Sequence, residues 1–383
     1  MYVSGPLYTV RLEGTIDGIE KVIYLFGDRH TEVENQTSCK QFDSITFNKF
    51  FYDNINNSPS NVTYDFFMET LLDSLNDIKY FNDPAFSHNL DIYIVNIRRM
   101  VYLIKKEKLL NNIRIHSSDI RNDNIINPMI NTNNLANKIN GYNFKNEYEE
   151  CLKSLENCHK ILKYIYDILI GKNIKNDNNI IDKHILLKLI KKFKHKTVKK
   201  EVLSFINKIL PGINVFIKIV TDMIDIIKYM ITNYEKCGVL ENKYDFETKL
   251  IYFDNELNSE CAKKINNFKK CAKKFDALSI WWISCITDIY AIKRILDKDY
   301  ITNAILYGGC FHTNDMIYIL MIHFNFKITH CSLYKNITQL NKNIIKNSSI
   351  QYINKIFYKP VLYVRLYNII QCSNLTGFPK YFL

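Results

Sequence analysis

The stretch VIYLFGDRH at residues 22–30 decides the fold. Its first five residues are all apolar and leave no polar face, which is typical of a strand covered on both sides by helices. The run at residues 7–13 alternates weakly between apolar and polar residues, and Asp17 and Gly18 between the two runs favour a tight turn. We therefore expect a hairpin whose second strand lies inside a sheet.

Three further short runs have a similar but less purely apolar character, at residues 64–68, 113–116 and 304–307. Helical periodicity lies between them, as at residues 91–105, and this alternation is the pattern of α/β proteins. Only 11 glycines and 7 prolines in 383 residues, together with 13% aromatic residues, exclude collagenous and globally disordered chains. We predict an α/β fold with a mainly parallel central sheet flanked by helices.

The middle of the chain has a different pattern. From about residue 143 to residue 273, apolar residues return every three or four positions, and no strand signal of comparable strength occurs. We predict a large all-helical insertion or cap at residues 141–275, between the two parts of an α/β core at residues 1–140 and 276–383. The Asn-rich stretch at residues 122–137 is expected to be a surface loop that enters the insertion.

Cysteine usage and the apolar segments indicate a cellular location. The ten cysteines form no CxxC pair, and Cys151 and Cys158 are spaced to share one helix face, so we expect buried thiols in a reducing compartment. The segment at Met1 lacks the apolar core of a secretory signal, and no stretch reaches the roughly 18 uncharged residues that a membrane span needs. The sequence predicts an intracellular, cytoplasmic protein with no membrane span.

The net charge of +12 has two interpretations. Heavy use of Asn, Ile and Lys, the residues of AT-rich codons, explains much of it without a selected partner. The densest basic stretch, at residues 188–200, could bind phosphate, but its apolar residues favour a solvated helix face. Nucleic acid is therefore not an expected partner. The coding bias is typical of an AT-rich genome such as that of a large DNA virus, which would place the protein in the host cytoplasm or the virion.

The same motif follows two of the predicted strands. The predicted strand at residues 22–26 leads into GDRHT at residues 27–31, and the run at residues 304–307 leads into GCFHT at residues 309–313. A glycine at the end of a strand lets the backbone turn sharply, so we predict Gly27 and Gly309 to be turn glycines. Each motif then presents a histidine at the carboxyl edge of the sheet, where ligands bind in open α/β folds.

Two other strands end in charged residues. Glu69 comes directly after an apolar run, and the strand that begins at residue 113 ends in Asp119-Ile120-Arg121. Taken singly, such a histidine is also explained as a cap or a buried hydrogen-bonding group, and such an acid as an N-cap or a surface ion pair. Taken together, they predict a shared site. The residues predicted at this edge are His30, His312, Glu69, Asp28, Asp119 and Arg121.

Two kinds of chemistry suit this set. Imidazoles and carboxylates at hydrogen-bonding distance can carry general acid–base catalysis. Alternatively, His30, His312 and Glu69 could hold a divalent metal with open positions. The sequence contains no P-loop, Gly-x-Gly-x-x-Gly, His-Glu-x-x-His or Gly-x-Ser-x-Gly motif, which argues against the common nucleotide-binding, zincin and α/β-hydrolase classes.

These motifs resemble the superfamily that groups erythromycin esterases, ChaN-like haem-uptake proteins, and the TraB and Tiki proteins. GDRH at residues 27–30 is similar to the first family motif, commonly Gly-Glu-x-His in the esterase and ChaN-like branches, and GCFH at residues 309–312 is similar to the second. Glu69 stands where the family usually has a strand-terminal glutamate, and residues 119–121 resemble a further polar strand end. Asp28 departs from the motif's glutamate and has a side chain one methylene shorter.

The resemblance implies an α/β core with a hydrolytic site at the strand edge. Tiki-like members are metal-dependent proteases, the esterase branch opens a lactone with His and Glu, and ChaN-like members bind haem. We accordingly expect a hydrolase of ester or peptide bonds. His30 and His312 would bind a divalent metal or activate water, and Glu69 would be a ligand or the general base.

Further roles and alternatives complete this prediction. Asp28 would orient His30, while Asp119 with Arg121 would position the substrate or stabilise negative charge. One alternative is a non-catalytic α/β scaffold that binds a protein partner through the helical insertion. Another is a haem-binding protein.

Overall fold

The chain forms two compact units. The computed structural model describes residues 1–29, 39, 43–71, 93–119, 123–139, 143–172, 189–237, 243–245, 250–252, 259–362 and 371–383. The first unit comprises residues 1–120, 192–202 and 287–383, and the second comprises residues 121–191 and 203–286. Sequence periodicity placed an insertion at residues 141–275.

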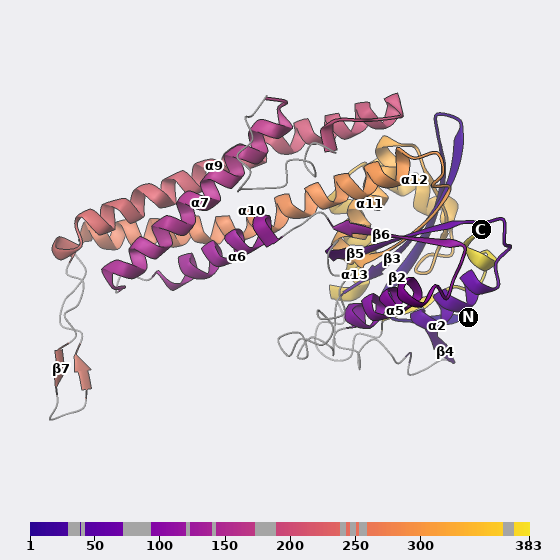
Figure 1. The fold of residues 1–383 in the computed structure, drawn as a ribbon, viewed down its shortest axis with the longest axis horizontal. Coiled ribbons are helices and arrows are strands. Elements are labelled where there is room, and N and C mark those ends of the chain that lie inside the picture. The colour runs from indigo at the N-terminus through magenta and orange to yellow at the C-terminus, as the bar shows by residue number, and fades with distance from the viewer. Residues whose placement is uncertain are drawn as a thin grey trace. The chain divides into compact units, whose positions relative to one another are not determined.

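A six-stranded sheet forms the centre of the first unit (Figure 1). Three of its five strand pairings, β3–β9, β9–β5 and β5–β6, are parallel, and the pairings β10–β2 and β2–β3 are antiparallel. The fold is therefore α/β. In spatial order the strands are β10 (Lys327–Cys331), β2 (Tyr8–Ile16), β3 (Ile19–Asp28), β9 (Asn303–Gly309), β5 (Tyr64–Leu71) and β6 (Ile113–Asp119).

The predicted hairpin is confirmed. β2 and β3 pair in antiparallel register from Tyr8 opposite Gly27 to Ile16 opposite Ile19. Asp17 and Gly18 at the turn have positive φ angles of 46° and 88°, the conformation that two-residue hairpin turns require. The central position of β3 explains its continuous apolar run, because both faces of this strand are buried.

Aromatic residues fill one face of this sheet. Phe26 of β3 and Tyr307 of β9 pack against Phe47, with ring centroids 4.9 and 4.7 Å apart, and Phe66 of β5 packs against Phe51 at 4.6 Å. Phe47 and Phe51 belong to α2, so this helix covers that face together with α5. α11 lies against β3 and β9 and packs on α13. The described α-helices that lie wholly in this unit are α2 (Phe47–Asn56), α5 (Tyr93–Glu107), α11 (Cys310–His323), α12 (Ile337–Asn347) and α13 (Ile350–Leu362).

A three-stranded sheet also belongs to the first unit. Its central strand β1 (Tyr2–Ser4) pairs with β4 (Ser44–Thr46) in parallel and with β11 (Cys372–Asn374) in antiparallel register. The amino-terminal and carboxyl-terminal parts of the chain therefore meet beside the central sheet.

The second unit is built mainly of helices. Its helix α7 (Lys145–Leu169) buries Cys151, Leu155, Cys158 and Leu162, which recur at helical spacing. Two longer helices contribute residues to both units, α9 (Lys196–Thr232) and α10 (Ser259–Leu296).

This unit is not all-helical. Within the described residues, β7 (Lys243–Asp245) pairs in antiparallel register with β8 (Leu250–Tyr252). Strands of three residues are too short to show an alternating pattern, which is why periodicity alone missed them.

The expected Asn-rich surface loop is instead the helix α6 (Asp123–Lys138). Met129, Thr132 and Ala136 are buried at helical spacing, and the Thr132 hydroxyl lies 2.7 Å from the Ser154 hydroxyl of α7. Only a few residues of this helix are buried, and asparagine at many of the other positions hid their helical spacing in the sequence.

The basic stretch at residues 188–200 is not one helix. Lys192 has a positive φ of 58°, and α9 begins at Lys196. Between them the buried His195 contacts Asp17 and Asp299, with N···O distances of 3.1 and 2.7 Å. The expectation of a solvated helix face therefore fails at this break, because a buried histidine that contacts two carboxylates stands where the helix was expected.

Two cysteine pairs depart from the expected thiols. Cys39 is joined to Cys372, and Cys237 to Cys261, with Cα–Cα distances of 5.8 and 5.7 Å. These partners are 333 and 24 residues apart, so no local motif revealed them. The predicted Cys151 and Cys158 are both free and buried.

The membrane expectation concerns a single helix. In the described part of the chain, α10 alone is long and apolar enough to cross a membrane by length and composition, and 56% of its most apolar window is buried inside the protein. A core helix of a soluble protein meets the same criteria, so α10 is weak support for a membrane span.

Candidate active site

Strand order brings the two Gly-x-x-His motifs to one edge of the sheet. β3 and β9 are neighbours and parallel, with Gly27 opposite Gly308 and Asp28 opposite Gly309. β5 lies on the other side of β9, with Met68 opposite Tyr307. Glu69, the next residue of β5, thus reaches the same edge as the second motif. His30 lies outside the described residues, so its distance from His312 stays a prediction.

The centre of the site is His312, which contacts a carboxylate at each ring nitrogen. His312 is the third residue of α11, whose N-cap is Gly309. Its Nδ1 lies 2.6 Å from Asp288 Oδ1, and its Nε2 lies 3.3 Å from Glu69 Oε1. The side chain is only 13% exposed. This geometry fixes the ring orientation and makes Nε2 the nitrogen that faces Glu69.

A backbone N–H and an arginine side chain of neighbouring elements hold Glu69. The Gly309 N–H donates to Glu69 Oε2 at 2.7 Å, and the Arg98 guanidinium donates to the Glu69 carbonyl oxygen at 2.8 Å. A Cβ at Gly308 would lie 3.3 Å from Glu69 Oε2, so a side chain there would press on this carboxylate. The glycines before α11 therefore let the glutamate approach the backbone.

Neither predicted turn glycine adopts a turn conformation that requires glycine, and Gly27 serves close packing. Neither Gly27 nor Gly309 has a positive φ, so neither position needs the conformational freedom of glycine. Gly27 lies inside β3, where a Cβ would lie 2.5 Å from the Tyr8 ring and 2.9 Å from Thr313 Oγ1. The motif glycine thus allows α11 to sit directly on the strand.

Asp288 and Asp315 extend the site, and sequence reasoning missed both. Asp288 lies near the end of α10 with a side chain 4% exposed, and it hydrogen-bonds to Asp315 of α11 as well as to His312. The sequence did contain a feature that pointed to Asp288, because it is the only charged residue between Ala277 and Ile292. A single carboxylate in an apolar helix needs a buried partner.

The charges of these groups follow from their contacts. Burial by itself lowers the pKa of His312, but the Asp288 and Glu69 carboxylates outweigh it and raise the pKa to about 11. Burial and the adjacent Asp288 carboxylate raise the pKa of Asp315 to about 8. Burial also raises the pKa of Asp288, although the imidazolium opposes this. These shifts favour the imidazolium form of His312 and a proton shared by the carboxyl pair of Asp288 and Asp315.

The remaining predicted site residues have mixed outcomes. Asp28 is fully buried and follows Phe26 by two positions, so strand alternation directs it to the α2 face. Asp119 ends β6 opposite Leu71, but its side chain is outside the described set, as is the whole of Arg121. Their predicted roles stay predictions.

Cysteine catalysis does not suit this site. Cys310 is the first residue of α11 and is buried, and burial raises the pKa of its thiol well above the usual range. A thiol that stays protonated is a poor nucleophile. Of the side chains at this site, the carboxylates and the imidazole are therefore better suited to chemistry than the thiol.

The predicted metal ligands were compared with the donor spacing that a metal requires. Ligand bonds of about 2.0–2.2 Å at a tetrahedral angle place two donors roughly 3.4 Å apart. The 3.3 Å separation of His312 Nε2 and Glu69 Oε1 fits this spacing, and Asp288 would orient the imidazole through Nδ1. In the described residues no group of three or more His, Cys, Asp or Glu side chains could hold a metal, and the third predicted ligand, His30, lies outside them. A metal here stays a prediction.

Comparison with known proteins identifies viral relatives. The model of a family described as a family of unknown function, DUF5847, matches residues 1–383. Uncharacterized protein R706 of Acanthamoeba polyphaga mimivirus is 31% identical over 99% of this chain and 96% of its own length. Uncharacterized protein R161 of the same virus is 26% identical over 99% of this chain and 98% of its own length. No solved structure matches the chain significantly. These matches agree with the expected viral origin and give no support to the esterase, ChaN and Tiki superfamily.

Proposed function

We propose that this chain, which belongs to the DUF5847 family of unknown function, is a hydrolase of ester or peptide bonds. The observation that carries the proposal is the buried carboxylate–imidazole–carboxylate arrangement of Glu69, His312 and Asp288 at the carboxyl edge of the sheet. Such an arrangement supplies an acid and a base in one place, as general acid–base hydrolysis requires.

Each residue then has a distinct part. Glu69 Oε1 accepts a proton from water, and the water oxygen attacks the carbonyl carbon. When the bond to the leaving group breaks, the imidazolium of His312 donates its Nε2 proton to that group. Glu69 finally returns its proton to His312, and Asp288 holds the ring in orientation throughout. The raised pKa of His312 supports the role of acid, whereas the sequence alone predicted that His312 would bind a metal or activate water.

The type of hydrolase rests on the sequence resemblance. The two Gly-x-x-His motifs begin on neighbouring parallel strands, and Glu69 reaches the same edge, which supports a kinship with the Tiki and erythromycin esterase type. A divalent metal held by His312, Glu69 and the predicted ligand His30 would supply a bound water of lowered pKa.

The test is turnover of ester and peptide libraries by purified wild type and by His312→Gln and Glu69→Gln variants. We expect each variant to lose about 10²- to 10⁴-fold in kcat/KM. The matched control is His323→Gln, at the other end of the same helix, whose Nδ1 lies 3.0 Å from Glu201 Oε2. It should retain wild-type activity.

Three results would contradict the proposal or redirect it. Full activity of His312→Gln would remove the assigned acid. Folded wild type that turns over no library member would favour the non-catalytic scaffold, and a Soret band on mixing with haem would favour the haem-binding alternative. Equimolar bound metal that disappears in His312→Gln would support the predicted metal and would make His312 and Glu69 its ligands in place of the acid and the base.

A further inference from the structure

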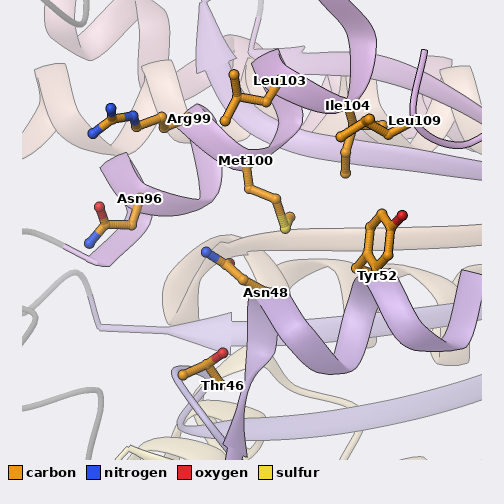
Figure 2. A pocket seen from close by; sticks show the side chains of 9 residues that line it. All are labelled: Thr46, Asn48, Tyr52, Asn96, Arg99, Met100, Leu103, Ile104 and Leu109. Carbon is orange, nitrogen blue, oxygen red and sulfur yellow. The ribbon is translucent and has the colours of Figure 1, made fainter. Parts of the chain in front are cut away.

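We propose that a pocket between α2 and α5 binds a small amphiphilic anion, independently of the hydrolase proposed above. The pocket has a volume of about 440 Å³. Figure 2 shows Asn48 and Tyr52 rising from α2 toward Met100 of α5. Small-molecule sites occupy roughly 300–1,000 Å³ and are mostly apolar, with a few placed polar groups, so this pocket suits a small molecule.

Some of the apolar side chains that line the pocket are exposed and are not part of the buried core. Ile97, Val101 and Ile104 of α5 recur at helical spacing and face the core, where they are buried. Leu103 lies beside this stripe and is 38% exposed, and Leu109 just after the helix is 44% exposed, although both line the pocket. Apolar surface left open beside a complete core marks a binding site.

The polar groups of the pocket define the ligand. Asn48 Oδ1 is buried and has no hydrogen-bond partner in the described part of the chain. A buried acceptor of this kind calls for an N–H or O–H donor. Arg99 is exposed at the rim, extends away from Met100 in Figure 2, and makes no ion pair with a described residue.

Charge complementarity selects an anion. The carboxyl end of α5 adds the exposed Lys106 and Lys108 to Arg99, and Glu107 is the one acid in this part of the helix. The ligand is therefore an apolar body with one hydrogen-bond donor for Asn48 and one negative charge for Arg99.

The probe that combines these features is 1-anilinonaphthalene-8-sulfonate, which has an anilino N–H, an apolar body and a sulfonate. Its fluorescence should titrate to saturation at one site, with an affinity that falls as salt rises. N-phenyl-1-naphthylamine is the matched probe without the sulfonate. Arg99→Glu should weaken sulfonate binding by roughly tenfold or more and change binding of the neutral probe by less than about twofold.

A second variant tests the pocket itself. Leu103→Trp fills the opening and should weaken both probes by roughly tenfold or more. The matched controls, Ile345→Trp and Lys346→Glu, lie on α12 at exposed positions and should bind both probes as wild type does.

Three outcomes would overturn the proposal. They are non-saturable binding, equal effects of Arg99→Glu on the two probes, and retention of both probes by Leu103→Trp. Binding of an acidic amphipathic peptide with no binding of either probe would show a protein-docking surface instead. Arg99 is exposed, so Arg99→Glu is expected to fold, and unfolding curves of all variants check this.

Discussion

Replacing Asp288 with asparagine tests the electrostatics of the candidate site without any substrate. Asparagine keeps the volume of the side chain and removes its charge. His312 then keeps only Glu69 at 3.3 Å as a carboxylate partner and loses the shorter contact of 2.6 Å. Because Asp288 contributes more than Glu69 to the raised pKa, the pKa of His312 should fall by more than half of its rise from 6.5 to about 11.

This change alters how stability depends on pH. A fall of two or more in the pKa corresponds to about 3 kcal/mol of lost stabilisation of the folded state. A group whose pKa is raised on folding stabilises the fold fully below its unfolded pKa, and this contribution is lost as the pH rises through the folded value. This loss is offset by removal of the burial cost of the Asp288 carboxylate, whose own pKa is raised on folding. We therefore expect the free energy of unfolding of Asp288→Asn, relative to wild type, to rise as the pH rises toward 11, because wild type then loses the larger imidazolium contribution.

Two measurements check this prediction. Nitrogen-15 NMR of protein labelled at histidine, with His312 assigned through His312→Gln, reports the titration of the ring. Urea unfolding at several pH values reports the free energy of unfolding. Glu201→Gln is the control, because Glu201 contacts the other histidine of α11, His323, and should leave the titration of His312 unchanged. A neutral His312 at pH 7 in wild type, or one titration midpoint shared with Asp288→Asn, would refute the reasoning.

Three further changes follow from the packing and the cross-links. Gly27→Ala should destabilise the protein by about 1–3 kcal/mol in urea unfolding, because its Cβ would lie 2.5 Å from the Tyr8 ring, and wild-type stability would contradict that contact. Burial lowers the pKa of Lys21 to about 8, so the stability of wild type should gain from rising pH between 8 and 10.5, and Lys21→Met should lose this gain in unfolding curves measured over that range. Replacing Cys39 and Cys372 with serine should cost about 2–5 kcal/mol in thermal or urea unfolding under oxidising conditions and nothing under reducing ones.

Local sequence patterns were sufficient to predict a structural element where its formation depends on its own residues. The turn at Asp17 and Gly18 and the apolar run that became β3 both follow from steric preference and burial along one segment. The same reasoning failed for α6, because its buried face rests on only a few residues among many asparagines. It also missed both disulfides, whose partners meet only after folding.

The candidate site shows the same division. Glu69 and His312 were recognisable in the sequence because each follows an apolar strand that ends at the ligand-binding edge of an α/β sheet. Asp288 was visible only as a charge that interrupts an apolar helix, and nothing local related it to a histidine on another helix.

The amino-acid order alone thus predicted the hairpin of β2 and β3, the strands that became β5, β6 and β9, and the polar residues at strand ends, because these depend on patterns within a few residues. The strand order β3–β9–β5, the meeting of Glu69, His312 and Asp288, and the protonated state of the imidazole were decided only by the tertiary structure. Distances between side chains and the loss of water around a charge arise from packing segments that lie far apart in the chain, and no local pattern encodes them.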